Sequence, residues 1–369
     1  RWHLPILHTP QPACPTAQPL PHARCPASMA APSPTVKIGV IGVGRIGKCH
    51  LESLSAMPNA TVTMIADVWE QGCRDAAAKY HIPNFTLVWQ ELVTSADVDA
   101  VLVCSHSSEH AEQVRMAIEN GKKVFCEKPL ARELHEIAEL AAAVQEHNAF
   151  VMVAFQRRFD SNFARIKQAT MSGEVGSVLH LHLISRDPAP PPMDYVAQSG
   201  GMINDMAIHD IDIANFLTGS ECVEVMAYTS CRQNEEIGKA GDIDLAMTIL
   251  KFSCGAIVTI DNARQTTYGY DQRVELFGTN GMIQSSNRFD NQCTIFDGTS
   301  VHGDLPMNFF MDRYKEAYKT EMAAFVKAIA DGGPPPCGVA EALAAARIAK
   351  AVKKSIDDKR PVQIAEIDA

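Results

Sequence analysis

A glycine-rich segment near the start of the chain constrains the fold more than any other feature. The short apolar run Val36–Ile41 is followed by Gly42-Val43-Gly44-Arg45-Ile46-Gly47 and by a segment of helical character. A second apolar run ends at Asp67, twenty residues after Gly47. A GxGxxG pattern alone is weak evidence. Placed between a strand and a helix, with an acidic residue after the next strand, it predicts a dinucleotide-binding βαβ unit.

The residues of this unit also indicate which dinucleotide would bind. Gly42 would allow the tight turn, Gly44 would let the backbone approach the pyrophosphate, and the helix N-terminus would face its charge. The carboxylate of Asp67 would accept hydrogen bonds from ribose hydroxyls and repel a 2′-phosphate. Two apolar residues follow Asp67 and no arginine is adjacent, although Arg74 lies one or two helical turns further on. The sequence therefore favours NAD over NADP.

Polar residues recur at the carboxyl ends of the expected parallel strands. Three further strands are predicted at Asp99–Cys104, Lys123–Cys126 and Phe150–Ala154. Ligands of open α/β sheets bind along this edge, so a crevice for cofactor and substrate is expected there. Proline after Lys128 restricts the backbone of the lysine, and a cis bond would aim its ammonium at one point; the alternative is a surface lysine in a turn. The residues that follow the strands are Ser105, His106, Glu127, Lys128, Pro129, Gln156, Arg157 and Arg158.

The sequence pattern changes after Arg158. Apolar and polar residues alternate in several runs separated by glycines, which predicts an antiparallel sheet. The runs are Leu179–Leu183, Ile243–Ile249, Ile257–Asp261, Arg273–Phe277 and Cys293–Phe296. Two late helices are expected at about Asp312–Ala330 and Ala340–Ser355, packed back on the first domain. The predicted fold class is therefore α/β: an N-terminal Rossmann parallel sheet in residues 36–157, then an α+β domain in residues 158–369 with a large, mostly antiparallel open-faced sheet.

A helical stretch, Gly200–Asp212, carries the most suggestive chemistry. Asp205, His209 and Asp212 are spaced i, i+4, i+7, so on an α-helix they form one row among apolar neighbours. A carboxylate beside a buried imidazole orients the ring and stabilises its protonated form, which suits a general base. The alternative is a core histidine held by Asp205. The helix would cover one face of the sheet and leave the other face open for oligomerisation.

A long proline-rich loop, Ser185–Tyr195, leads into this helix. It would form a pocket wall from which Asp187 could hydrogen-bond a polyol, or it would be a structural linker.

Composition excludes several classes of function. A net charge of -10 argues against binding nucleic acid or an anionic membrane surface, and no apolar run reaches 18 residues. The 11 cysteines include no CxxC pair, which indicates a reducing compartment. His106 and His110 stand four residues apart, but no further ligand motif accompanies them, so no metal site is expected.

Residues 1–35 are predicted to lie outside the fold and to be disordered. They contain nine prolines, no acidic residue and no apolar periodicity, and Met29 stands shortly before the first strand. The segment is either an organellar transit segment or sequence upstream of a start at Met29. We expect a cytoplasmic protein, with organellar import as the alternative.

Together these segments resemble the glucose–fructose oxidoreductase/inositol dehydrogenase (Gfo/Idh/MocA) family, from about Val36 to the C-terminus. The resemblance rests on Gly42–Gly47, on Glu127-Lys128-Pro129 and on Asp205-x-x-x-His209. Finer segments are most similar to the inositol 2-dehydrogenases of this family: Phe155–Asp160, Ser185–Pro192 and Tyr268–Arg273.

The resemblance implies a catalytic trio of Lys128, Asp205 and His209, and a cis Lys128–Pro129 bond. It also implies a homo-oligomer, a tetramer or dimer, built through the open sheet. Gly42 to Gly47, Asp67, Ser105, His106, Glu127 and Lys128 would bind NAD. One departure is that Ser105-His106 stands where many members have Thr or Ser followed by Pro, which puts the shape of the cofactor loop in doubt.

The implied reaction is NAD-dependent oxidation of a ring secondary alcohol of a cyclic polyol, best matched by the C2 hydroxyl of myo-inositol becoming 2-keto-inositol. His209 would take the hydroxyl proton, Asp205 would orient the ring, and Lys128 would donate to the substrate oxygen. The remaining hydroxyls would be recognised by Arg157, Asp187 and one of Tyr268 or Tyr270. The alternatives are another substrate (scyllo-inositol, an aldose or a dihydrodiol) or a non-catalytic NAD-binding regulator.

Overall fold

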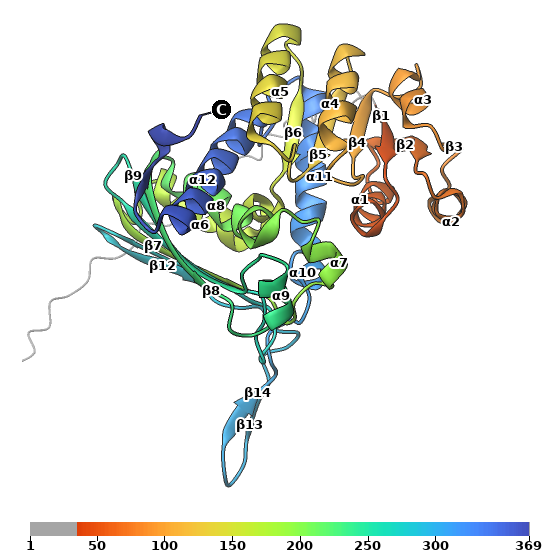
Figure 1. The fold of residues 1–369 in the computed structure, drawn as a ribbon. Coiled ribbons are helices and arrows are strands. Elements are labelled where there is room, and N and C mark those ends of the chain that lie inside the picture. The colour runs from red at the N-terminus through yellow and green to blue at the C-terminus, as the bar shows by residue number, and fades with distance from the viewer. Residues whose placement is uncertain (1–34, 369) are drawn as a thin grey trace, which may run out of the picture. The chain divides into compact units, whose positions relative to one another are not determined.

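Two large sheets organise the protein, which is described here by a computed structural model (Figure 1). The structure describes residues 35–368. The N-terminal segment predicted to be disordered therefore lies outside the described residues, apart from Thr35. Among residues 35–368, no helix is both long and apolar enough to cross a membrane.

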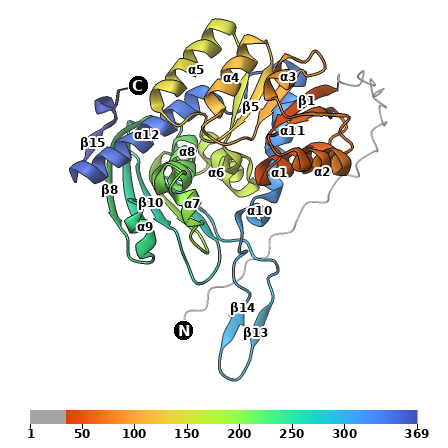
Figure 2. The same ribbon diagram turned by 45° about the vertical axis from the view of Figure 1, so that its right-hand side comes forward.

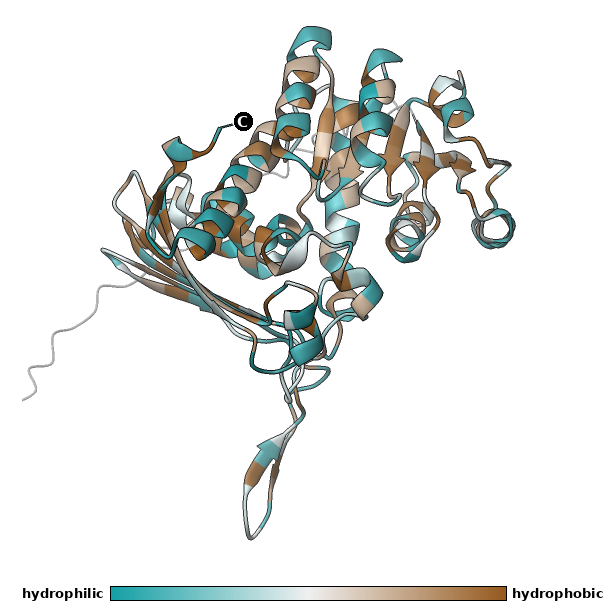
Figure 3. Ribbon diagram, viewed as in Figure 1, coloured by the Kyte–Doolittle hydropathy of each residue, from teal (hydrophilic) through white to brown (hydrophobic). Residues whose placement is uncertain are grey.

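The first sheet has six parallel strands in the order β3-β2-β1-β4-β5-β6, which confirms the predicted Rossmann sheet. All four residues of β4 and of β6 are buried, as expected for a parallel sheet covered on both faces. Figure 3 shows these strands as the most hydrophobic part of this region, with hydrophilic residues on the helices around them. The short edge strand β3 was not predicted. The strands are β1 (Val36–Ile41), β2 (Ala60–Ala66), β3 (Asn84–Thr86), β4 (Ala100–Val103), β5 (Lys123–Glu127) and β6 (Val151–Ala154). The helices between them are α1 (Arg45–Ser55), α2 (Glu70–Tyr80), α3 (Trp89–Thr94), α4 (His110–Glu119) and α5 (Leu134–His147).

The second sheet has seven strands in the order β12-β11-β7-β10-β9-β8-β15. Its pairings are antiparallel except that between β7 and β10, so the prediction of a mostly antiparallel sheet is confirmed. The strands are β7 (Val178–Arg186), β8 (Cys222–Ser230), β9 (Leu245–Phe252), β10 (Ile257–Ala263), β11 (Asp271–Gly278), β12 (Gly281–Ser285) and β15 (Val362–Gln363).

One predicted strand of this sheet is misplaced. The run Cys293–Phe296 forms β13 (Thr294–Phe296), which pairs only with β14 (Val301–Gly303). The resulting hairpin extends away from the sheet in both ribbon views (Figures 1 and 2). Alternation predicts a strand but not its partner, because the partner is chosen by tertiary contacts.

The two faces of the second sheet differ. Along β9 the side chains of Ala246, Thr248, Leu250 and Phe252 are buried, whereas Met247, Ile249 and Lys251 are exposed. The buried face is covered by helices, among them α6 (Ser161–Met171), α8 (Ile208–Thr218) and α12 (Val339–Asp358) (Figure 1). His180 and His182 pair with Ile257 and Thr259 of β10 and share the outer face with them.

The C-terminal helices join the two sheets. Helix α11 (Lys315–Asp331) packs against α1 and β1, and α12 packs against α5, α8 and β8. The short α10 (Phe310–Arg313) precedes them. Tyr314, Tyr318 and Phe325 are buried, which makes them core residues. Short elements near the site are a 3₁₀ turn at Gln156–Phe159, α7 (Met193–Val196), a π-helical turn at Ile203–Ala207 and α9 (Glu235–Lys239). A last 3₁₀ turn is at Ile364–Glu366.

Candidate active site

The glycine-rich turn between β1 and α1 is shaped to receive a ligand. Gly42 has φ +92°, and a Cβ there would lie 2.5 Å from the carbonyl oxygen of Cys104. A Cβ on Gly47 would lie 2.0 Å from the carbonyl oxygen of Gly42, so the first and last glycines close the turn. A Cβ on Gly44 would meet no described atom within 4 Å, and α1 begins directly after it. The open space at Gly44 fits a pyrophosphate at the helix N-terminus.

Asp67 lies at the end of β2, beside this turn. Its carboxylate accepts hydrogen bonds from the backbone N–H groups of Val43 (2.8 Å) and Trp69 (2.9 Å). A carboxylate has about four acceptor positions, so two ribose hydroxyls can still bind. Arg74 is paired with Glu70 on the same helix and lies over the ring of Phe85. Arg74, the one nearby arginine that could have received a 2′-phosphate, is therefore paired with another residue.

The loops after β4 and β5 are held together by His110. Its Nδ1 lies 2.7 Å from the carbonyl oxygen of Pro129, and its Nε2 lies 3.2 Å from that of Ser105. Glu127 is hydrogen-bonded to Nε2 of His50 on α1, at 2.7 Å. The Lys128–Pro129 peptide bond is cis, which confirms that expectation. These contacts place the predicted cofactor residues Ser105, Glu127 and Lys128 along one edge of the sheet.

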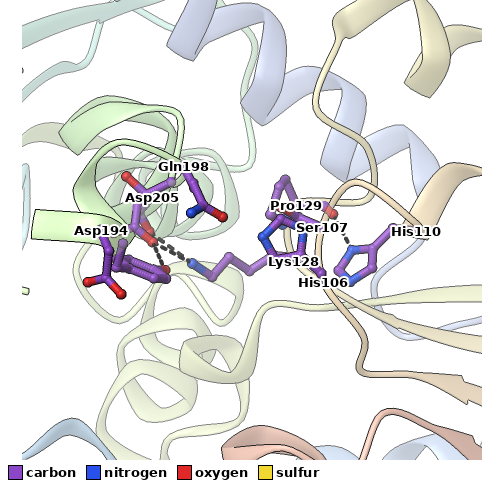
Figure 4. A pocket seen from close by; sticks show the side chains of 10 residues that line it. His106, Ser107, His110, Lys128, Pro129, Asp194, Gln198 and Asp205 are labelled. Carbon is purple, nitrogen blue, oxygen red and sulfur yellow. Dashed lines mark hydrogen bonds and ion pairs between the residues drawn. The ribbon is translucent and has the colours of Figure 1, made fainter. Parts of the chain in front are cut away.

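Lys128, which follows β5, points toward Asp205 of the π-helical turn (Figure 4). The ammonium donates to the backbone carbonyl of Asp205 at 2.9 Å and lies 3.4 Å from its Oδ1. Both side chains face a cavity of about 290 Å³ that could hold a sugar-sized molecule. The residues lining the cavity are His106, Ser107, His110, Lys128, Pro129, Asp194, Tyr195, Gln198, Ser199 and Asp205.

His209 is buried and is not among the residues that line this cavity, although the charge of Lys128 acts on its imidazole. Burial lowers its pKa well below 6.5, and the positive charges of Lys128 and Arg157 lower it further. Its ring packs edge-on to Phe155, with the ring centroids 6.2 Å apart. Nδ1 has no hydrogen-bond partner among residues 35–368. A neutral imidazole close to a lysine ammonium is chemically suited to accept a proton.

Asp205 and Asp212 form their hydrogen bonds with residues other than His209, so their place in one row with the imidazole stays a prediction. Asp205 is bonded to Lys128, Tyr195 and Arg264, and Asp212 forms a two-point pair with Arg158 at 2.8 and 2.6 Å. Asp205 lies in the π-helical turn Ile203–Ala207, whereas His209 lies in α8.

The structure separates the four predicted substrate residues. Arg157 is 4 % exposed, is paired with Asp210 at 2.6 Å and is not among the residues that line the cavity. Tyr270 is buried and packs edge-on to Tyr314. Tyr268 lies outside the Lys128 cavity and bonds Arg186 and Asp271, each at 2.8 Å.

Asp187 keeps properties suited to a ligand contact. Burial raises the pKa of its carboxyl to about 7, and the nearby charges of Arg264 and Arg157 limit that rise. A carboxyl group poised near neutral pH, and partly accessible, can exchange hydrogen bonds with substrate hydroxyls.

Two residues that contact Asp205 were not predicted as site residues. Tyr195, at the end of the proline-rich loop, donates from its hydroxyl to Oδ1 of Asp205 at 2.8 Å. Arg264 follows β10 and is 1 % exposed. A buried arginine leaves no periodic signal in a sequence, because its partners lie 22 and 59 residues away in the chain.

Family models match both parts of the chain. Residues 36–155 match the oxidoreductase family with an NAD-binding Rossmann fold, and residues 163–284 match the GFO/IDH/MocA C-terminal domain. The chain belongs to the GFO/IDH/MocA family of oxidoreductases. The NAD-binding turn, the cis Lys128–Pro129 bond and the open-faced sheet are therefore features of a GFO/IDH/MocA protein.

Relatives within the GFO/IDH/MocA family match nearly the whole described chain. It is 40 % identical over 332 residues to the myo-inositol 2-dehydrogenase of Thermotoga maritima, covering 90 % of this chain and 99 % of the relative. It is 36 % identical over 331 residues to the inositol 2-dehydrogenase of Rhizobium meliloti, covering 90 % and 100 %. The crystal structure of a scyllo-inositol dehydrogenase from Lactobacillus casei, with bound NAD(H) and scyllo-inositol, superposes with a TM-score of 0.84 at 27 % identity, covering 90 % and 99 %.

Proposed function

We propose that this protein oxidises a ring secondary alcohol of a cyclic polyol with NAD, and that its substrate is myo-inositol, oxidised at C2 to 2-keto-inositol. The observation that carries the proposal is the contact of Lys128 with Asp205, which brings an ammonium from the NAD-binding sheet to a helix of the second domain at a cavity of about 290 Å³. The names of the relatives support inositol as the substrate.

The proton of the alcohol passes to His209 in this proposal. The lowered pKa keeps the imidazole unprotonated at neutral pH, so a ring nitrogen can accept the hydroxyl proton. Lys128 donates a hydrogen bond to the substrate oxygen and stabilises the negative charge that develops on it. NAD, when bound, accepts the hydride that leaves the carbinol carbon. One proton and one hydride leave the alcohol, and a ketone remains.

Asp205 acts on Lys128 rather than on His209. Its backbone carbonyl and Oδ1 both face the ammonium, so it orients the lysine toward the cavity. This assignment replaces the expectation that Asp205 orients the imidazole ring. Asp187 is proposed to contact the other hydroxyls, and the positive charge of Arg157 favours its ionised form.

NAD is favoured over NADP by Asp67 and by the engagement of Arg74 with Glu70. A 2′-phosphate would lie beside a carboxylate with no free arginine of this helix to receive it.

We also infer a homo-oligomer, a dimer or tetramer, formed through the outer face of the second sheet. Several large apolar side chains on that face are 44 to 67 % exposed, which is typical of a surface that another copy covers. They are Tyr228, Met247, Ile249, Ile257, Phe277 and Met282.

A substrate panel tests the function. The purified protein is incubated with NAD and, separately, with myo-inositol, scyllo-inositol, glucose and xylose, and NADH absorbance is followed. We expect NADH to form fastest with myo-inositol and not to form with NADP in place of NAD. Preference for scyllo-inositol or an aldose would reassign the substrate. Absence of turnover with all four would favour a non-catalytic NAD-binding regulator, which the presence of Lys128, Asp205 and His209 now disfavours.

A further inference from the structure

The carboxylate of Asp205 is held by donors from three separate parts of the chain. Lys128 Nζ lies 3.4 Å from Oδ1, and the hydroxyl of Tyr195 donates to the same oxygen at 2.8 Å. Arg264 Nη1 donates to the other oxygen, Oδ2, at 3.1 Å. The two oxygens therefore have different surroundings: Oδ1 faces the cavity, and Oδ2 faces the interior.

Among the three donors to Asp205, Arg264 is the one that burial and further hydrogen bonds hold in place. Its side chain is 1 % exposed, whereas Tyr195 is 48 % exposed. The backbone N–H of Arg264 is bonded to the carbonyl of Asp244 at 2.9 Å, and Nη2 lies 3.3 Å from Oδ2 of Asp242. Asp242 in turn accepts hydrogen bonds from the backbone N–H of Met202 at 3.0 and 3.2 Å.

These bonds form a continuous chain from the start of the helical segment to the cavity. Met202 precedes the π-turn that carries Asp205, so Asp242 holds the backbone of the segment and Arg264 holds the side chain. A buried guanidinium is stable only when its charge is paired, and its planar fork can bridge two carboxylates at once. A lysine has one point charge on a flexible stem and cannot bridge both in the same way.

We propose that Arg264 is a positioning residue of the active site. It fixes the orientation of the Asp205 carboxylate, and Oδ1 of this carboxylate then holds the ammonium of Lys128 toward the substrate. This inference rests on the proposed function, in which Lys128 contacts the substrate oxygen. Without Arg264, Oδ2 loses its donor and the carboxylate is free to turn toward Lys128 with both oxygens. The ammonium is then drawn away from the cavity.

The pKa of Asp205 depends on the donors that surround its carboxylate. Burial raises the pKa of its carboxyl, but Lys128, Arg264 and the Tyr195 hydroxyl lower it more, and the pKa lies below its usual value. Asp187 is the other acidic group that faces Asp205, and Asp242 acts on it through Arg264. Removing the guanidinium raises the pKa of Asp205, so Asp205 becomes protonated at a higher pH.

Three variants of the full chain test the proposal by steady-state oxidation of the preferred polyol across pH. Arg264→Met removes the charge, Arg264→Lys keeps it without the fork, and Arg165→Met is the control. Arg165 pairs with Glu174 on the surface, where both side chains are about half exposed. We expect Arg264→Met to lower kcat by about 10²-fold, as small displacements of catalytic groups do. We also expect the acidic limb of its pH profile to move to higher pH while NAD affinity stays unchanged.

Arg264→Lys should restore the position of the acidic limb but only part of kcat, and Arg165→Met should match the wild type. A wild-type kcat and pH profile in Arg264→Met would overturn the proposal. So would a lower kcat with an unmoved acidic limb, since a purely structural role predicts that result.

A double-mutant cycle of Arg264→Met and Asp205→Asn, measured by thermal unfolding, needs no substrate. We expect the two changes to be non-additive because the side chains are in contact. Additive effects would refute the proposed positioning contact. If the wild-type protein oxidises no polyol while the cycle shows coupling, the proposed function fails and the Arg264–Asp205 contact stands.

Discussion

His209 shows how burial and neighbouring positive charges together lower the pKa of a single residue. No carboxylate among the described residues is hydrogen-bonded to its ring, yet its pKa is lowered well below 6.5 by desolvation and by Lys128 and Arg157. The imidazole is therefore a ready proton acceptor at neutral pH. The sequence proposed this residue as a general base beside a carboxylate, whereas no carboxylate is hydrogen-bonded to the ring in the described part of the chain.

Replacing His209 with alanine should lower kcat by about 10²–10⁴-fold, because general-base catalysis contributes that much. NAD affinity, measured by fluorescence titration, should change little, since the glycine-rich turn lies between β1 and α1 and His209 lies in α8. His147→Ala, at an exposed position of α5, is the matched control. Unchanged turnover in His209→Ala would remove the histidine from the mechanism.

Asp187 should make polyol binding depend on pH. Its pKa is raised to about 7, so the carboxyl ionises as the pH rises through that value and becomes a stronger acceptor for hydroxyl groups. KM for the polyol is expected to fall between about pH 6 and about pH 8. Asp187→Asn should flatten this dependence, whereas Asp357→Asn, at an exposed site, should keep it. A pH-dependent KM that persists in Asp187→Asn would contradict the assignment.

At the scale of elements, two glycines of the turn between β1 and α1 are expected to have different roles. Gly47 is needed for folding, and Gly44 is needed for NAD binding. A Cβ on Gly47 would collide with the carbonyl oxygen of Gly42, whereas a Cβ on Gly44 would enter open space. Gly47→Ala should therefore lower the melting temperature. Gly44→Ala should keep the melting temperature and weaken NAD binding at least tenfold, which is about 1.4 kcal/mol. Equal losses of stability in both variants would show that Gly44 has a structural role only.

Helix α11 contains a buried acid that we expect to destabilise the fold. Glu321 is fully buried, and neither carboxylate oxygen has a hydrogen-bond partner among residues 35–368. Burial raises its pKa well above 4.5, and the charges of Glu127 and Asp212 add to the rise. Glu321→Met should stabilise the protein by about 1–3 kcal/mol, the usual penalty for an unsatisfied buried polar group.

The pH dependence of stability checks this explanation. A folded-state pKa above the unfolded value means that the folded state binds the proton more tightly, so stability is greatest below the unfolded pKa and falls as the pH rises. The gain in melting temperature from Glu321→Met should thus be larger at about pH 8 than at about pH 5. Glu316→Met, exposed on the same helix, should give no such gain. A loss of stability in Glu321→Met would indicate that the carboxyl has a partner.

At the scale of the whole molecule, the outer face of the second sheet predicts assembly. The double variant Met247→Glu/Ile249→Glu places two charges at the centre of this face, and we expect a smaller species than the wild type in light scattering after size-exclusion chromatography. Met171→Glu, at an exposed position at the end of α6, should leave the assembly unchanged. A monomeric wild-type protein would refute assembly through this face.

The division of the chain into two domains at residue 157 stays a prediction, because α11 and α12 connect the two sheets.

The sequence by itself determined the order of five of the six strands in the NAD-binding half and the position of the glycine turn, and it proposed Lys128, Asp205 and His209 as site residues. These follow from local patterns: apolar runs, glycine spacing and the placement of Asp67. Tertiary structure alone decided that β13 pairs outside the sheet, that Asp205 bonds Lys128 and Arg264, and that Asp212 pairs with Arg158. The physical reason is that the choice of a strand's partner and the pairing of buried charges depend on tertiary contacts, about which short-range periodicity carries no information.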